Sequence, residues 1–189
     1  MKADTPDYMQ CRPEIVGGLI ETVSTALLRT FPKVTADPYE IELILDALRV
    51  MRPNVVEIQM LDGVLYMACG RWDDAIRILS EVCATAPHFG YGKALLAFCL
   101  STKGDDAWKQ HAAEALESSP NDDTLVLVKA LQAREDMVKA VQANRNGGPF
   151  VPPQSVCELN AELERSAPQA EQPIAERVEV AQYGATLRA

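Results

Sequence analysis

The chain has 189 residues, of which 48% are hydrophobic and only 6% are aromatic. Its length fits one domain of ordinary size, and its apolar content is sufficient for a core. The formal net charge of −9 argues against nucleic acid or anionic membrane as a partner, because binding to either requires clustered Lys and Arg.

We expect neither a targeting signal nor a membrane-spanning segment. Residues 1–14 lack the unbroken apolar stretch that a secretory signal needs. Elsewhere the apolar stretches are interrupted within a few residues, well short of the roughly 20 that span a bilayer. The sequence therefore favours a protein that is synthesised and folds in the cytoplasm.

Helical periodicity dominates the sequence, and strand signals are scarce. Proline and glycine mark the ends of the helical segments: Pro53, Pro87 and Pro120 each close one, because proline lacks the amide proton and disfavours helix in the preceding residue. Seven helices are predicted, over Pro13–Thr30, Pro38–Met51, Asn54–Ala68, Trp72–Thr85, Tyr91–Thr102, Asp106–Glu117 and Asp122–Ala143.

The composition changes after the last of these helices. Asn146-Gly147-Gly148-Pro149 breaks the helical pattern, and the following residues are rich in Ala, Gln, Glu and Pro. We predict a flexible N-terminus over residues 1–12, a helical domain over 13–145 and a disordered tail over 146–189. Within the tail, residues 156–163 are expected to form only a transient helix, and residues 178–183 are a candidate pairing segment.

The punctuating residues recur at a regular interval. Pro53 and Pro87 are 34 residues apart, Pro87 and Pro120 are 33 apart, and Gly70 and Gly104 are 34 apart. A period near 34 is typical of the tetratricopeptide helix-turn-helix, whose stacked pairs share a core and curve into a superhelix. The sequence predicts an all-α fold, a tetratricopeptide-like right-handed superhelix of about seven antiparallel-packed helices.

Residues 56–89 match the repeat best. The tetratricopeptide repeat requires a small residue where its two helices approach closely. It also requires an aromatic residue on the first helix and a glycine at the turn between the helices. The residues that define the repeat in this way are Gly63, Tyr66, Gly70, Trp72, Ala75 and Pro87, with Gly104 at the turn of the next unit.

The two flanking units are degraded. In the first, Ile41, Leu45 and Leu48 align with Ala75, Leu79 and Val82 of the middle unit. In the third, Ala97 replaces the first small residue, and Lys109 stands where the second should be, which indicates a local slip around Trp108.

The inner wall of such an array comes from four positions of each first helix. In this chain they are Glu57, Met60, Val64, Met67, Tyr91, Ala94, Phe98 and Ser101. Most are apolar, and the adaptable methionines suit an amphipathic helix laid in a groove. Apolar spacing alone fits core residues equally well. The last helix, with Leu125, Val128, Leu131, Val138 and Val141 on a stripe, either caps the open end or folds into the groove.

No constellation of residues points to catalysis, a cofactor or a metal. Neither His88 nor His111 has a second ligand at metal spacing. Three of the cysteines fall within apolar helical patterns, where a free thiol behaves as a small hydrophobe. The five cysteines are Cys11, Cys69, Cys83, Cys99 and Cys157, and the three in helical patterns are Cys69, Cys83 and Cys99.

Four blocks carry a resemblance to a known family: residues 14–20 (EIVGGLI), 45–53 (LDALRVMRP), 70–77 (GRWDDAIR) and 92–99 (GKALLAFC). With them, the chain resembles the Hrp type III secretion accessory family over about residues 13–132. The resemblance implies a non-enzymatic component of the secretion system of proteobacterial pathogens, needed for pilus or needle assembly. It also implies an architecture similar to that of the needle-subunit chaperones, whose concave face holds the amphipathic helix of a subunit.

Two hypotheses follow. In the first, the groove binds and chaperones a needle, pilus or inner-rod subunit. In the second, the chain is a structural component of the apparatus that acts through its convex surface or its tail. The resemblance adds the periplasm as an alternative to the cytoplasm. The sequence does not decide between a monomer and a homo-oligomer. An enzyme of cell-wall remodelling has no residue constellation in its favour.

Overall fold

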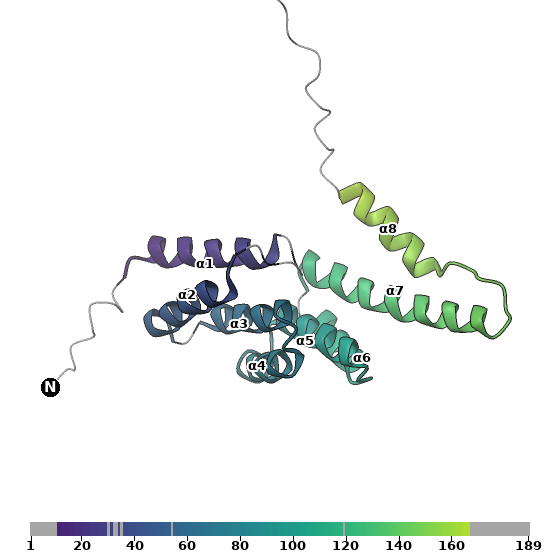
Figure 1. The fold of residues 1–189 in the computed structure, drawn as a ribbon, viewed down its shortest axis with the longest axis horizontal. Helices are drawn as coiled ribbons and strands as arrows, with labels where there is room; N and C mark the ends of the chain where they lie inside the picture. Colours follow the sequence, from purple (N-terminus) through teal and green to yellow (C-terminus); the bar gives the residue numbers. More distant parts are fainter. Residues whose placement is uncertain are drawn as a thin grey trace, which may run out of the picture.

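The computed structural model describes residues 11–29, 31, 34, 36–53, 55–118 and 120–166. All the regular secondary structure in this part of the chain is helical, which confirms the all-α prediction (Figure 1). The eight helices are α1 (Pro13–Leu28), α2 (Pro38–Met51), α3 (Val56–Ala68), α4 (Trp72–Thr85), α5 (Gly90–Lys103), α6 (Trp108–Glu117), α7 (Asp122–Arg145) and α8 (Gln154–Ser166). The expectations for residues 1–10 and 167–189 lie outside the described residues.

Side-chain oxygens start two of the helices. At α2 the Asp37 Oδ1 accepts a hydrogen bond from the Tyr39 amide at 2.9 Å, and Pro38 occupies the first turn, where its missing amide proton costs nothing. At α7 the Asn121 Oδ1 accepts from the Thr124 amide at 2.9 Å. Both starts are therefore fixed by local sequence.

Glycines in the left-handed conformation end α3 and α5. Gly70 has a φ of +71° and Gly104 a φ of +78°, values that side chains with a Cβ rarely adopt. After α3 the Arg71 amide donates to the Tyr66 carbonyl at 2.8 Å, which satisfies an end of the helix that would otherwise lack a partner. The chain can then reverse into α4.

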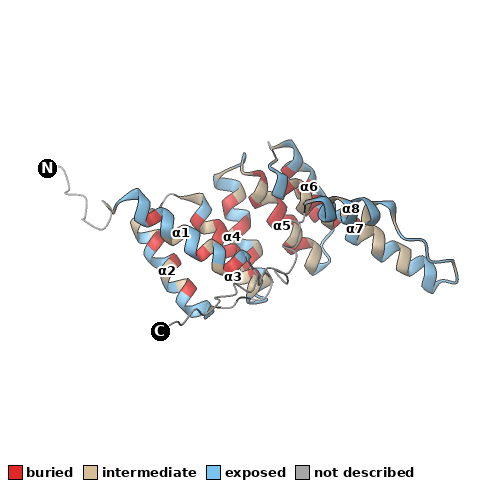
Figure 2. Cartoon of the chain, turned by 90° about the horizontal axis from the view of Figure 1, so that it is seen from above, coloured by how far each residue is buried: buried red, intermediate tan, exposed pale blue. Residues whose placement is uncertain are grey.

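The helices pack in sequence, each against the next. In addition α1 contacts α3, and α5 contacts α7, so that α1, α3, α5 and the first half of α7 lie along one side of the stack. Buried residues gather in α3, α4 and α5, whereas the second half of α7 and α8 project from the stack and are largely exposed (Figure 2).

The second helices of the stack bury the same stripe. The aligned residues Ile41, Leu45 and Leu48 of α2 and Ala75, Leu79 and Val82 of α4 are all at most 2% exposed, as the 34-residue register predicts. In α6 the buried residues are Trp108, Ala112 and Ala115, each 33 residues after its counterpart in α4. The slip at Trp108 is therefore one residue, and it leaves Lys109 exposed.

Two glycines allow close helix approach. A Cβ at Gly63 would lie 2.8 Å from the Cγ and Cδ2 of Leu79, so α3 packs tightly on α4 there. In the next unit Ala97 is fully buried. Gly90 allows the close approach of α5 to α6 instead, because a Cβ at Gly90 would lie 2.9 Å from the backbone oxygen of Ala115. The repeat pattern in the sequence does not identify Gly90 for this role.

We expect Gly90→Ala to destabilise the protein by about 1–3 kcal/mol, because the new methyl group meets a backbone oxygen that cannot rotate away. Gly18→Ala is the matched control, since nothing lies within 4 Å of a Cβ at that position of α1. Alanine should there stabilise the helix by about 0.5–1 kcal/mol. Urea denaturation of both variants measures the difference, and equal effects would contradict the close approach at Gly90.

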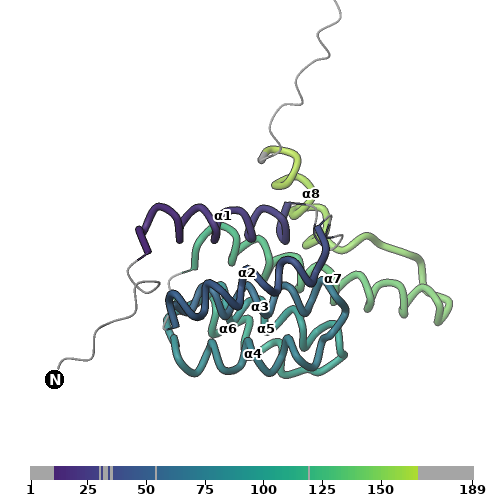
Figure 3. The backbone as a smooth tube through the Cα atoms, turned by 60° about the vertical axis from the view of Figure 1, so that its left-hand side comes forward, coloured from purple at the N-terminus to yellow at the C-terminus, as the bar shows by residue number. Residues whose placement is uncertain are grey.

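The helical part extends further than the sequence predicted. Helix α8 lies within the segment expected to be disordered, and residues 156–163 are only its centre. It runs antiparallel to α7: the Ser155 hydroxyl donates to Asp136 Oδ2 at 2.8 Å, and Lys129 Nζ lies 2.7 Å from Glu162 Oε2. Figure 3 shows the chain turning back after α7 to place α8 beside it. The sequence signal was weak because α8 buries no residue completely.

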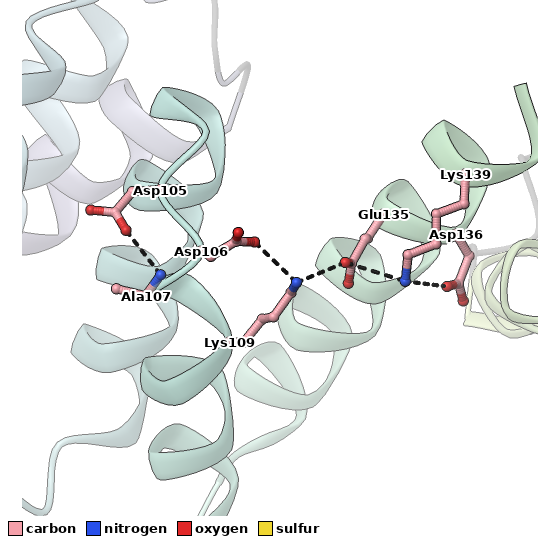
Figure 4. A network of polar contacts seen from close by, with 7 residues as sticks. All are labelled: Asp105, Asp106, Ala107, Lys109, Glu135, Asp136 and Lys139. Atoms are coloured by element: carbon pink, nitrogen blue, oxygen red, sulfur yellow. Dashed lines mark hydrogen bonds and ion pairs between the residues drawn. The ribbon is translucent and has the colours of Figure 1, made fainter. Parts of the chain in front are cut away.

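Ion pairs connect α6 to the projecting half of α7 (Figure 4). Lys109 Nζ lies 3.0 Å from Asp106 Oδ1 and 2.9 Å from Glu135 Oε1, and Lys139 Nζ lies 3.2 Å from the same Glu135 oxygen. The hydrogen bond from Lys109 is the main cause that holds the pKa of Glu135 below its ordinary value. These ion pairs are on the surface and are screened by salt, so we expect them to contribute little to the free energy of folding.

Candidate partner-binding groove

An apolar cavity of about 330 Å³ opens on the side of the stack formed by the first helices. It is bounded by the end of α1, by α3 and α5, and by the first half of α7. Its lining residues are Leu28, Phe31, Val64, Met67, Tyr91, Leu95, Phe98, Asp123, Val126, Leu127 and Ala130. Asp123 is the one charged residue among them.

A second cavity of about 510 Å³ continues from the first. The two share Phe31, Met67 and Phe98, and the second adds Trp72 at the start of α4 and Arg134 of α7. The Phe98 ring centroid lies 6.5 Å from that of Phe31 and 6.2 Å from that of Trp72, so the aromatic rings form a continuous surface. We call the two cavities together the apolar groove.

Four of the predicted wall residues line this groove. Val64 and Met67 are 1% and 3% exposed and form its floor, whereas Tyr91 and Phe98 are partly exposed and stand at its sides. They come from α3 and α5, the two first helices to which the repeat register assigned the wall.

The structure places the other predicted wall residues elsewhere. Met60 and Ala94 are 8% and 0% exposed and belong to the hydrophobic core, while Glu57 is exposed at the start of α3. Ser101 is partly buried on α5 and accepts a hydrogen bond from Arg134. None of these four residues lines the groove. The reason is that α3 and α5 have neighbours on most sides, so several of their apolar positions face other helices. At Met60 and Ala94 the core interpretation therefore holds.

The sequence did not identify the residues on the two outer sides of the groove, although it predicted that the last helix either caps the stack or folds into the groove. One is Leu28, the last residue of α1, which is 41% exposed. The other is α7, where Val128 and Leu131 are buried against the core while Val126, Leu127 and Ala130 face the groove. The first half of α7 thus both caps the stack and forms one wall. The run of apolar residues at 125–128 was the available signal, because it is wider than one helical stripe.

The predicted stripe of α7 fails in its second half. Val138 is 49% exposed and Val141 only partly buried, since this half projects from the stack and carries α8.

Charged groups stand at opposite ends of the apolar groove. Asp123 is at the α7 N-terminus, and Arg134 lies eleven residues further along the helix, where it donates to the Ser101 hydroxyl at 3.1 Å. Neither has an ion-pair partner among the described residues. Burial, with a smaller effect of the Asp123 carboxylate, raises the pKa of Tyr91 and keeps its phenol neutral.

The thiols near the core are held protonated. Burial raises the pKa of Cys83 to about 11 and that of Cys99 to about 12, so neither is a ready nucleophile at neutral pH. Cys69 differs from the expectation of an apolar position, because it follows the last residue of α3 and is exposed.

The described part of the chain offers neither a metal-binding cluster nor a membrane-spanning helix. No group of three or more His, Cys, Asp and Glu residues is placed to hold a metal ion there. Within the same residues, no helix combines the length and the apolar character needed to cross a bilayer.

A family model described as "Bacterial type III secretion protein (HrpB1_HrpK)" matches residues 6–137. The chain belongs to this family. The match confirms the resemblance to the Hrp type III secretion proteins, and the matched region contains every residue that lines the apolar groove, whereas α8 lies beyond it. No significant match was found among curated proteins or among solved structures.

Proposed function

We propose that this member of the HrpB1_HrpK family binds an amphipathic helix of a needle, pilus or inner-rod subunit in its apolar groove, and chaperones the subunit or helps to assemble it. The proposal assigns no catalytic reaction to the chain. The observation that carries it is the apolar groove itself, which lies inside the region that the family shares.

The shape and chemistry of the groove support a helical partner. Its floor is rigid, because Val64 and Met67 belong to the packed core, and its sides expose leucine and aromatic side chains that a partner would remove from water. An amphipathic helix buries such a surface through anchors spaced at i, i+3, i+4 and i+7. The recurring 34- and 33-residue register also supports a tetratricopeptide-like assignment for the stacked pairs, in which this side is the concave one.

We place this role in the cytoplasm, where a subunit needs protection from premature polymerisation. The alternative is a structural role in the periplasm, through the convex surface or the tail. Cell fractionation separates them: a chaperone should be found with unassembled subunit in the cytoplasm, whereas a stable periplasmic pool would favour the structural role.

Leu28→Glu is expected to weaken binding of the subunit at least tenfold, because a carboxylate would have to be buried under the bound helix. Leu43→Glu in α2 is the matched control, since Leu43 has a similar exposure of 50% against 41% for Leu28 but lies outside the groove. Both exposed leucines should tolerate the change without unfolding, which circular dichroism checks. Met60 is unsuitable for this test because its substitution would disrupt the core.

The first measurement is a pull-down of each needle, pilus and rod subunit of the secretion cluster with the wild-type chain and the two variants. A subunit that is retained by the wild type and Leu43→Glu but not by Leu28→Glu supports the groove. Retention by all three, with both variants folded, would show that the subunit binds elsewhere.

A further inference from the structure

The last described helix returns the chain toward the apolar groove. Because α8 is antiparallel to α7, Ser155 pairs with Asp136 and Glu162 with Lys129. One more turn brings Ser166 to the level of about residue 125 of α7. The neighbouring residues Asp123, Val126 and Leu127 line the groove. The chain that follows Ser166 therefore starts within about a helix diameter, 10–12 Å, of the groove.

The remaining chain is long enough to enter it. Twenty-three residues follow Ser166. Residues 167–175 alone can span about 30 Å when extended, which is sufficient to pass around α7. The groove extends along α7 from Asp123 to Arg134, about 17 Å at the rise of an α-helix.

The sequence of this segment carries the anchors that an apolar groove selects. Val180, Tyr183 and Leu187 are spaced at i, i+3 and i+7, so in a helical conformation they would share one face. Glu176 precedes this set on the same face, and Arg188 follows it. These two charges would lie about 18 Å apart along a helix, close to the spacing of the two charges of the groove.

The charges are complementary in one orientation. With the segment antiparallel to α7, Glu176 meets Arg134 and Arg188 meets Asp123, the two groove residues that have no ion-pair partner among the described residues. The three apolar anchors then lie over the aromatic surface around Phe98.

We infer that residues 176–188 of the chain occupy its own apolar groove and are displaced by the partner subunit. This inference rests on the proposed function of the groove. The segment is tethered, so it acts at an effective concentration on the order of millimolar. The bound segment thereby covers the apolar groove when no subunit is present. A subunit binds only if its affinity for the groove is high enough to displace this tethered segment.

The test uses the full-length chain and a fluorescent peptide with the sequence of residues 170–189. Tyr183→Ser with Leu187→Ser removes two anchors in cis, and Ile174→Ser with Val178→Ser is the control on the opposite face. The peptide should bind the anchor variant about tenfold more tightly than the wild type or the control, because its site is no longer occupied. Adding Leu28→Glu to the anchor variant should abolish this binding.

Trp72 gives a second readout, because it lines the groove and Trp108 is buried elsewhere. Its emission should shift to longer wavelength in the anchor variant and return when the peptide is added. Equal peptide binding to wild type and anchor variant, or no binding to either, would overturn the inference. Neither outcome involves a subunit, so the proposed function would still be judged separately by the pull-down.

Discussion

Replacing Leu79 by alanine is expected to lower the free energy of unfolding by about 2–5 kcal/mol. Leu79 is fully buried in α4, at the centre of the stripe that recurs in α2, α4 and α6. Truncation leaves a cavity that the surrounding helices can fill only partly. Chemical denaturation followed by circular dichroism measures the loss, and a change below about 1 kcal/mol would contradict the packing described for α4.

The contact of Leu79 with Gly63 makes a sharper version of this experiment. Gly63→Ala alone should destabilise by about 1–2 kcal/mol, since its Cβ would lie 2.8 Å from Leu79 Cγ and Cδ2. In the double variant the truncated side chain vacates that space, and alanine favours the helix over glycine. The double variant should therefore be at least about 1 kcal/mol more stable than the sum of the single effects. Strict additivity would show that α3 and α4 do not meet at Gly63.

Asp62 is expected to reduce stability at neutral pH. It lies on α3 against α2 and is 5% exposed, with its Oδ1 3.5 Å from Arg49 Nη2. Burial, partly offset by Arg49 and assisted by Asp46 and Glu42, raises the pKa of Asp62 from 3.8 to about 6. Arg49 also contacts Asp46 at 2.5 Å, so Asp62→Asn does not leave the guanidinium without a carboxylate. The variant should be more stable than the wild type at pH 7 by about 2–3 kcal/mol.

The pH dependence follows from the sign of that shift. Below about pH 4 the carboxyl is protonated in both states. Between about pH 4 and 6 the unfolded chain has released a proton that the folded protein retains, so wild-type stability falls as pH rises through this window. The advantage of Asp62→Asn should therefore be small at pH 4, grow up to about pH 6 and then stay constant. Asp73→Asn removes a carboxylate whose side chain is 84% exposed and is the surface control. An advantage that is the same at pH 4 and pH 7 would refute the assignment.

The recurring spacing of 33 or 34 residues was sufficient to predict the ends and the buried stripes of the central helices. Pro53, Pro87 and the left-handed glycines end helices through backbone geometry that local sequence determines. The stripes of α2 and α4 followed from the same register, because each helix must bury one face against its neighbours. The handedness of the superhelix stays a prediction.

The groove was only half predictable for a physical reason. Apolar spacing identifies positions that avoid water but does not say which neighbour covers them. Met60 faces the core and Met67 the groove, although both are buried residues of α3. The outer sides at Leu28 and Val126 depend on how α1 and α7 are placed by tertiary packing. Helix α8 was predicted only as a transient helix over residues 156–163, because its contact with α7 relies on pairs such as Lys129–Glu162, which leave no periodic trace in the sequence.

The central claim is that a secretion subunit binds in the apolar groove, and its most direct test is the dissociation constant of that subunit for the wild type, Leu28→Glu and Leu43→Glu. Isothermal titration calorimetry gives all three values under one condition. We predict that Leu28→Glu raises the constant at least tenfold and that Leu43→Glu changes it less than twofold. Equal constants for all three folded proteins would contradict binding in the groove.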